Sequence, residues 1–132
     1  RRVLFRSLAR VGMSHIADKQ AADLTFPEKA LVEMARALCT QPKVVLLDEV
    51  MAALNHAEMD QILALIRKLR EEDGLTFVVI EHHMRAIMNL CERILVLSFG
   101  QLIAEGTPQE ISRHPDVISA YLGSDTHAGA HA

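Results

Sequence analysis

Two short segments of this chain end in side chains that could do chemistry on a phosphate group. The segment KVVLLDEV places the adjacent carboxylates of Asp48 and Glu49 after an apolar run, and TFVVIEHH places Glu81 and His82 after another. An Asp at the end of a buried strand can hold Mg²⁺, usually through water, because this ion keeps much of its hydration shell. Glu49 could orient or deprotonate a water molecule that attacks a phosphate, and His82 could stabilise the charge of the transferring phosphoryl group.

The alternative for Asp48 and Glu49 is a structural one. Two adjacent carboxylates can form a solvated strand end that begins a loop, and the pair alone does not decide between the two interpretations. The second apolar run, which also ends in a carboxylate and an imidazole, favours the chemical interpretation. That interpretation requires a fold that brings the two segment ends together.

The pattern around these residues predicts such a fold. Residues 44–47 and 76–80 are short, apolar and rich in β-branched residues, which is typical of strands buried on both faces. Between them, residues 55–58 (Asn-His-Ala-Glu) form a capping box that begins an amphipathic helix, and the helix ends at Asp73-Gly74. A strand, a crossover helix and a second strand form a right-handed parallel pair. Ligands of open α/β sheets bind beyond the carboxyl ends of the strands, where all four polar side chains would lie.

The remaining elements follow from the same signals. Residues 28–40 carry apolar side chains at helical spacing, and Thr107-Pro108-Gln109-Glu110 is a further capping box with Pro in the first turn. An opening helix is expected over residues 2–12, a short helix over 84–91, and a hairpin over 94–97 and 102–104 with its turn at Phe99-Gly100. The small, polar tail at 124–132 is expected to be disordered.

Composition excludes several classes of protein. The 132 residues suit one compact domain, and a net charge of −3, from 14 basic and 17 acidic residues, provides no basic footprint for nucleic acid or an anionic membrane surface. Cys39 and Cys91 sit among apolar residues without zinc spacing and are expected to be buried, reduced thiols of a cytosolic protein. No apolar run approaches the roughly 18 residues of a membrane span, so no direct span is expected.

The order and spacing of several motifs resemble a known family. The segments ALVEMARALCTQPKVVLLDEVMAALNHAEMDQI and LTFVVIEHHMRAIMNLCERILVLSFGQLIAEGTPQEI look like the C-terminal half of an ATP-binding-cassette (ABC) transporter ATPase. The shorter segments AALNHAE, IEHHM, IAEGTP and HPDVISAYLG resemble the ATPase subunits of branched-chain amino acid importers. The resemblance implies an α/β, P-loop NTPase-like parallel sheet with flanking helices, of which this chain is a part that lacks the N-terminal Walker A half. It also implies ATP and Mg²⁺ as cofactors.

The family roles can be carried over by position. The resemblance makes Asp48 the Walker B residue that serves Mg²⁺ through water, Glu49 the catalytic glutamate and His82 the switch histidine. The D-loop, which crosses a dimer interface in the family, would include Ala53, Leu54 and Asn55. The family usually has an acid after the switch histidine; His83 stands here, and we expect it to be an exposed residue at the start of a helix. The resemblance divides the chain into residues 1–41, the end of the helical subdomain with the signature helix; 42–100, the Walker B, D-loop and switch-histidine part; 101–123, the C-terminal extension; and the tail, 124–132.

The signature loop departs from the family. Leu24, Thr25, Phe26, Pro27 and Glu28 stand where a Leu-Ser-Gly-Gly-Gln pattern, or a Pro-Tyr-Gly variant, presents a hydroxyl, N–H groups and a helix N-terminus to the γ-phosphate of the opposite subunit. The hydroxyl is kept, but Pro27 has no N–H to donate and Glu28 brings a negative charge. The same residues form a good capping box. We therefore expect a well-formed helix and a phosphate contact weakened by about 1.5–3 kcal/mol.

The resemblance supports two functional hypotheses. The first is an ATP-hydrolysing subunit, present here as a fragment, that powers import of branched-chain amino acids or similar small solutes. Its partners would be a second ABC ATPase subunit and the membrane permease subunits, at the cytoplasmic face of the plasma membrane. The second is a catalytically silent ABC-like module that dimerises or regulates without ATP turnover. No Gly-x-x-x-x-Gly-Lys-Ser/Thr phosphate loop occurs in the chain. This chain alone is therefore expected to bind ATP poorly, and one edge of its sheet to be exposed.

Overall fold

The computed structural model describes residues 2–122, and the chain divides into two units, residues 1–86 and 87–132, which are described separately below. The first unit carries the two segments with polar ends, and the second carries the expected hairpin. The expected tail lies outside the described residues. The helices and strands along the chain are α1 (Arg2–Arg10), α2 (Phe26–Leu38), β1 (Val44–Asp48), α3 (His56–Asp73), β2 (Thr76–Ile80), α4 (Met84–Leu90), β3 (Ile94–Ser98), β4 (Gln101–Gly106), α5 (Pro108–Ser112) and α6 (Pro115–Val117).

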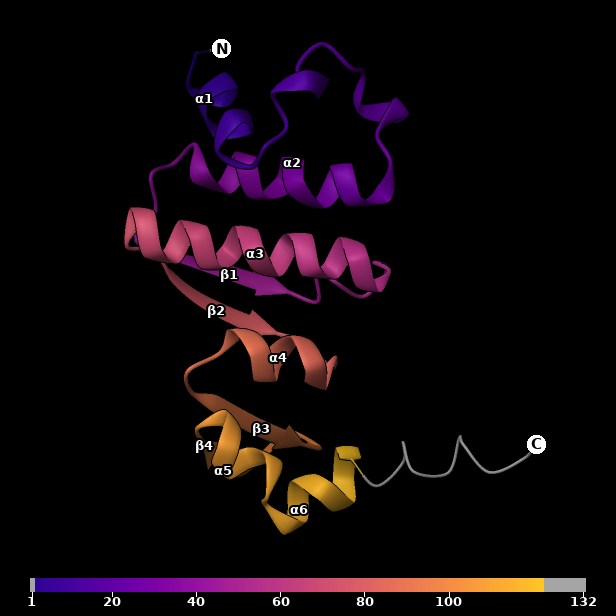
Figure 1. The fold of residues 1–132 in the computed structure, drawn as a ribbon, viewed down its shortest axis with the longest axis vertical. Coiled ribbons are helices and arrows are strands. Elements are labelled where there is room, and N and C mark those ends of the chain that lie inside the picture. Colours follow the sequence, from indigo (N-terminus) through magenta and orange to yellow (C-terminus); the bar gives the residue numbers. More distant parts are fainter. Residues whose placement is uncertain (1, 123–132) are drawn as a thin grey trace, which may run out of the picture. The chain divides into compact units, whose positions relative to one another are not determined.

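In the first unit, β1 and β2 form the expected parallel pair, with α3 as the crossover (Figure 1). Their register sets Val44 against Thr76 and Asp48 against Ile80, so both strands end at the same level. The crossover helix begins at the predicted capping box, in which the Asn55 and Glu58 side chains each bond the other residue's backbone N–H. Gly74 ends it with φ 64°, a left-handed conformation that glycine adopts without steric cost.

One face of this sheet is buried and the other is not. Val45 and Leu47 are buried, as is the apolar stripe of α3, which consists of Met59, Ile62, Leu63, Ile66 and Leu69. On the opposite face Val44 is 51%, Leu46 74%, Val78 50% and Ile80 58% exposed. The prediction that both strands are buried on both faces is therefore wrong within the described residues. The reason is that none of the described elements covers the second face.

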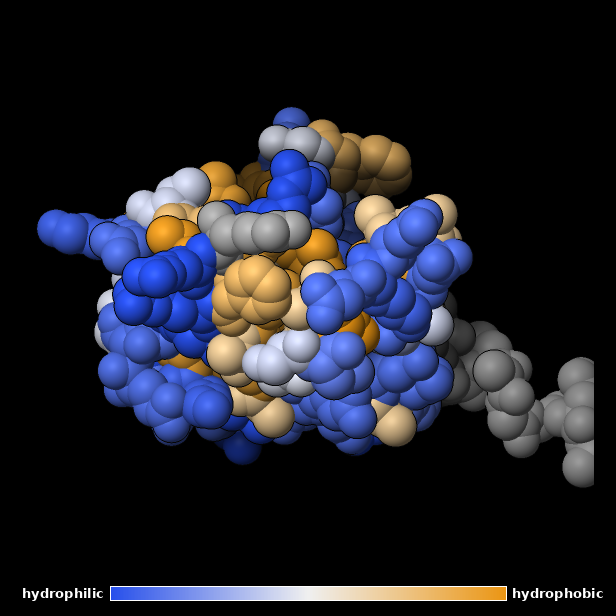
Figure 2. Space-filling view, turned by 90° about the horizontal axis from the view of Figure 1, so that it is seen from above, coloured by the Kyte–Doolittle hydropathy of each residue, from blue (hydrophilic) through white to orange (hydrophobic). Residues whose placement is uncertain are grey.

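The helices preceding β1 agree with their sequence signals. The predicted helix over 28–40 is α2, which begins two residues earlier because Thr25 and Glu28 form a capping box around Pro27. Met34, Ala35 and Leu38 are buried, while α1 contacts α2 and leaves Val3, Leu4 and Phe5 exposed. Figure 2 looks onto the α1 side, where apolar side chains lie among hydrophilic ones. Cys39, which follows α2, and Cys91 are only half-buried, whereas the sequence predicts that both are fully buried.

The second unit contains the predicted hairpin. Strands β3 and β4 pair antiparallel, with a register shift between Val96 and Leu97, and turn at Phe99 (φ 47°) and Gly100 (φ 76°). Two successive positive φ values match the right-handed twist of hairpin strands. Helices α5 and α6 follow, each with one buried apolar residue, Ile111 and Val117. The Tyr121 hydroxyl donates to the Leu97 carbonyl at 2.5 Å, which ties the π-helical turn Ile118–Leu122 to the hairpin. Among residues 2–122, no helix combines the length and apolarity needed to cross a bilayer.

Candidate functional site

The carboxyl ends of β1 and β2 bring the predicted acid and imidazole together. The Glu49 amide donates to the Ile80 carbonyl at 2.8 Å, which extends the pairing of the strands by one step. His82 follows two residues later, and its Nδ1 lies 3.7 Å from Glu49 Oε1. The Glu49 and His82 side chains are 55% and 56% exposed, and Asp48 is also exposed. Of the four side chains expected at this sheet edge, Glu49 and His82 lie together, and both are exposed to solvent.

Glu49 owes its direction to an unusual backbone conformation. Its φ is 49°, in the left-handed region that non-glycine residues rarely occupy. Asp48 next to it belongs to β1, so the backbone changes from extended to left-handed between the two residues that carry the carboxylates. Sequence spacing alone could not reveal this turn, because Asn, Asp and Gly, not Glu, are the residues that usually mark it.

The segment after Glu49 folds into two successive turns before α3. The Ala52 amide bonds the Glu49 carbonyl at 3.2 Å, and the Leu54 amide bonds the Met51 carbonyl at 3.1 Å. Met51 and Leu54 are buried, while Ala53 and Asn55 are exposed. Of the three residues predicted to lie at a dimer interface, Leu54 thus packs inside its own unit and Asn55 uses its side chain to cap α3.

Glu81 and His83 lie beside the candidate site with side chains that the sequence does not explain. Glu81 Oε1 accepts from the Met51 amide at 2.9 Å, and its Oε2 is buried without a hydrogen-bond partner among the described residues. We expected His83 to be exposed, but it is half-buried. Its ring packs against that of His82, with the ring centroids 4.6 Å apart. The Glu81–Met51 bond spans 30 positions of the chain, and no local motif indicates it.

The negative charge of Glu28, in the predicted signature loop, is balanced by Lys19 and by the Thr25 amide. Lys19 Nζ lies 3.0 and 2.9 Å from the two Glu28 carboxylate oxygens, and the Thr25 amide donates to Glu28 Oε2 at 2.7 Å. The Lys19 bond and then the Thr25 amide hold the pKa of Glu28 below its ordinary value. In return, Thr25 Oγ1 accepts from the Glu28 amide at 3.4 Å. The predicted capping box is confirmed. The contact with Lys19, nine residues away, was not predicted.

Helix α2 and strand β1 border one cavity. A cavity of about 460 Å³ is lined by residues of α2 and β1 and of the segment after β1, and these include Phe26, Met34, Val45 and Glu49. The lining is mainly apolar, and Phe26 is well exposed. Leu24 and Pro27, which are near Phe26 in the sequence, are half-buried. The start of α2 and the catalytic candidate therefore face the same hollow of the first unit.

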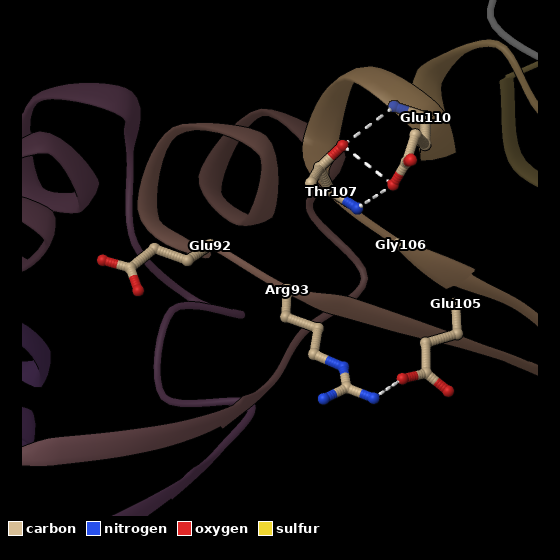
Figure 3. A pocket seen from close by; sticks show the side chains of 6 residues that line it. All are labelled: Glu92, Arg93, Glu105, Gly106, Thr107 and Glu110. Atoms are coloured by element: carbon tan, nitrogen blue, oxygen red, sulfur yellow. Dashed lines mark hydrogen bonds and ion pairs between the residues drawn. The ribbon is translucent and has the colours of Figure 1, made fainter.

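A cavity in the second unit has no such chemistry. It is lined by Glu92, Arg93, Glu105, Gly106, Thr107 and Glu110 (Figure 3). Arg93 pairs with Glu105, Glu110 bonds the amide and hydroxyl of Thr107 as part of the capping box of α5, and the Glu92 side chain points away from the others. The Thr107–Glu110 bonds cap α5 and the Arg93–Glu105 pair links the segment before β3 to β4, so the Glu105 and Glu110 carboxylates are engaged in structural contacts.

The residues at the sheet edge fit a hydrated Mg²⁺ that is shared with a ligand. Within residues 2–122, no cluster of three or more His, Cys, Asp or Glu side chains could hold a metal ion. Mg²⁺ does not require one, since it commonly takes one or two carboxylates and completes its octahedron with water and phosphate oxygens. The exposed carboxylate of Asp48 at the end of β1 satisfies this requirement. The phosphate-binding loop that would hold the nucleotide is not in this sequence.

Comparison with known proteins agrees with this geometry. A family model described as "Branched-chain amino acid ATP-binding cassette transporter" matches residues 101–127. The chain is 40% identical over 116 residues to BraF, a high-affinity branched-chain amino acid transport ATP-binding protein of Pseudomonas aeruginosa. It is also 40% identical over 116 residues to LivG of Escherichia coli K12, which has the same description. Both matches cover 88% of this chain and 46% of the relative, so the chain spans about half the length of the curated relatives it matches.

A solved structure extends the likeness to the fold. The ADP conformation of MJ1267, an ATP-binding cassette of an ABC transporter, matches 92% of this chain and 49% of its own with a TM-score of 0.83 and 31% identity. The likeness in sequence thus coincides with a likeness in three dimensions over almost the whole chain. Over most of its length the chain is thus similar, in sequence and in fold, to ATP-binding cassettes of ABC transporters, and the relatives named above are described as branched-chain amino acid transport ATP-binding proteins.

Proposed function

We propose that this chain provides the magnesium, water and phosphoryl contacts of an ATP-hydrolysing subunit that powers import of branched-chain amino acids or similar small solutes. One observation carries the proposal: Glu49 and His82 leave adjacent parallel strands and meet at 3.7 Å beside Asp48. An acid and an imidazole at this edge suit a reaction in which a water is activated and a phosphoryl group is transferred.

Each side chain would have one task. Asp48 would hold Mg²⁺ through water, and the bound ion would supply charge neutralisation at the phosphates. Glu49 would accept a proton from, or orient, the attacking water, since its carboxylate is exposed and lies 3.7 Å from His82 Nδ1. His82 would donate a hydrogen bond to the phosphoryl oxygens as charge shifts in the transition state. Its contact with Glu49 would orient the imidazole for this task.

The other components of the reaction would come from outside this chain. The phosphate loop would lie in the half of the relatives' length that this chain does not match, and a second ATPase subunit would contribute its own signature loop across the dimer interface. Membrane permease subunits would carry the solute and would hold the ATPase at the cytoplasmic face of the plasma membrane. The D-loop residues Ala53 and Asn55 are exposed and available for the dimer contact.

A catalytically silent, dimerising or regulatory module is the second candidate. The observation in its favour is the signature loop, where Pro27 lacks an N–H and Thr25 Oγ1 and Glu28 are engaged with each other and with Lys19. Against it, Asp48 is present at the end of β1, and the Glu49 and His82 side chains lie 3.7 Å apart. The two candidates differ in whether ATP is turned over when the missing components are supplied.

The test is complementation. This chain is mixed with a polypeptide that corresponds to the unmatched half of BraF and carries its phosphate loop, and ATP hydrolysis is measured with Mg²⁺. Turnover that falls by about 10²–10⁴-fold in Glu49→Gln supports the proposal, because that is the usual contribution of a general base. Glu72→Gln, an exposed carboxylate on α3, is the control and should leave turnover unchanged. A complex that forms but hydrolyses no ATP, or turnover that is insensitive to Glu49→Gln, would support the silent module.

A further inference from the structure

The loop between β1 and α3 is fastened to the end of β2 at two points. The first is the backbone bond from the Glu49 amide to the Ile80 carbonyl, at 2.8 Å. The second is the bond from the Met51 amide to the carboxylate of Glu81, at 2.9 Å. The two bonds flank Val50 and lie on either side of the turn that directs the Glu49 side chain. The Glu81 side chain thus bonds the loop at a position that the backbone hydrogen bonds between β1 and β2 do not reach.

This second fastening supports an unfavourable backbone conformation. A left-handed φ at Glu49 is disfavoured for a residue with a Cβ atom and persists only where the surrounding structure holds it. The Ala52 amide closes the turn back onto the Glu49 carbonyl, and Met51 is fully buried. With the Met51 amide held by Glu81, the turn cannot relax by rotating away from β2.

The chemistry of Glu81 indicates more than stabilisation. One carboxylate oxygen accepts the Met51 amide, but the other is buried without a partner among the described residues. Burying an unpaired carboxylate oxygen is unfavourable, so stability alone gives little reason for an ionisable side chain here. The next residue is His82, so the group that fixes the Glu49 loop lies on the same strand end as the imidazole that meets Glu49.

We propose that Glu81 is a positioning residue that holds the Glu49 turn beside His82, so that the acid and the imidazole keep a fixed relative placement. The proposal deepens the proposed function, because the placement matters only if Glu49 and His82 act together. Through Met51 and the turn to Leu54, the same bond also fixes the loop that leads to the cap of α3 at Asn55. Glu81 itself would touch neither water nor phosphate.

The contact can be tested in this chain without nucleotide. Amide hydrogen exchange is followed by NMR for the wild type, Glu81→Leu, Glu81→Gln and the exposed control Glu72→Leu. Loss of one hydrogen bond should raise exchange at Met51 about tenfold in Glu81→Leu, while Glu81→Gln, which keeps an acceptor, should stay within about threefold of the wild type. The Ala35 amide in the buried face of α2 reports global opening and should not change. Unchanged exchange at Met51, or an equal rise at Ala35, would overturn the proposal.

A measurement on the wild type protects the test against a variant that does not fold. A scalar coupling across the hydrogen bond, from the Met51 amide nitrogen to the Glu81 carboxylate carbon, should be detectable, and its absence would overturn the contact. In the complemented ATPase, Glu81→Leu should lower kcat about tenfold with KM for ATP little changed. Glu81→Gln, which keeps an acceptor, should keep kcat near the wild-type value. If the wild-type complex hydrolyses no ATP, the proposed function fails, while the exchange and coupling data still decide whether Glu81 fixes the loop.

Discussion

At the scale of single residues, the structure changes the interpretation of Glu28 in the predicted signature loop. Glu28 stands where the family has an uncharged Gln, and a free carboxylate there would repel a polyphosphate. Instead, the carboxylate is held by Lys19 and by the Thr25 amide, so its charge is balanced before any ligand arrives. The local pattern Thr-x-x-Glu predicts the Thr25 bond, because capping boxes have a fixed spacing. It cannot predict Lys19, whose approach depends on the path of residues 20–24.

This contact makes a prediction about pH. The pKa of Glu28 is lowered in the folded protein, first by Lys19 and then by the Thr25 amide. A lowered folded-state pKa stabilises the protein fully above the unfolded-state pKa, and the stabilisation is lost as the pH falls through the folded-state pKa. The difference in unfolding free energy between the wild type and Glu28→Gln should therefore be largest near neutral pH. Below the ordinary carboxyl range it should shrink.

Urea denaturation at several values from about pH 7 to about pH 3 checks this. Lys19→Met should reduce the pH-dependent part in the same direction, since it removes the main cause of the shift. Glu72→Gln, on the exposed surface of α3, is the control. A difference that grows as the pH falls would contradict the assigned contact.

At the scale of elements, the helix that joins β1 to β2 shows how far local signals reach. Its N-cap, its apolar stripe and its glycine C-cap are all readable from the sequence, and the structure confirms each of them. The parallel pairing follows as well, because a strand, a crossover helix and a strand leave few alternatives. The burial of the strands does not follow. Val44, Leu46, Val78 and Ile80 have the composition of a buried face, but none of the described elements covers them.

The N-cap of α3 yields a prediction of stability. Asn55 accepts the Glu58 amide at 3.0 Å and Glu58 returns a bond to the Asn55 amide at 2.9 Å. Asn55→Ala should lower the unfolding free energy by about 1 kcal/mol, within a range of about 0.5–2 kcal/mol. Asn55→Asp keeps the acceptor and should stay close to the wild type. Thermal or urea unfolding followed by circular dichroism measures both, and an unchanged Asn55→Ala variant would show that the box contributes nothing here.

At the scale of the whole molecule, the main feature is the exposed face of the sheet formed by β1 and β2. Its four apolar side chains lie on two neighbouring strands, and β1 and β2 each have an outer edge without a partner strand among the described residues. Exposed apolar strands with open edges favour association between chains. The sequence predicts the open edge from the missing family motifs. The exposed face could not be predicted, because the sequence of a strand does not show which elements pack on each face of the sheet.

We therefore expect the isolated chain to self-associate through this face. The double variant Leu46→Thr with Ile80→Thr should reduce self-association and the binding of a hydrophobic dye, while its unfolding free energy stays within about 0.5 kcal/mol of the wild type, as is usual for exposed positions. Sedimentation velocity and dye fluorescence provide the measurement. Leu47→Thr, on the buried face of β1, is the matched control and should destabilise the unit by about 2 kcal/mol or more. Equal self-association of the double variant and the wild type would count against the sheet face.

The alternation of side chains along β1 has a consequence for how such a chain can vary. Val45 and Leu47 face the interior, and the same two-residue period sets the direction from which Asp48 leaves the strand. Insertion or deletion of one residue within β1 would move the side chains between Val45 and Asp48 on one side of the change to the opposite face of the sheet. Selection for a packed interior would therefore also preserve the face from which Asp48 leaves the strand, without acting on Asp48 itself.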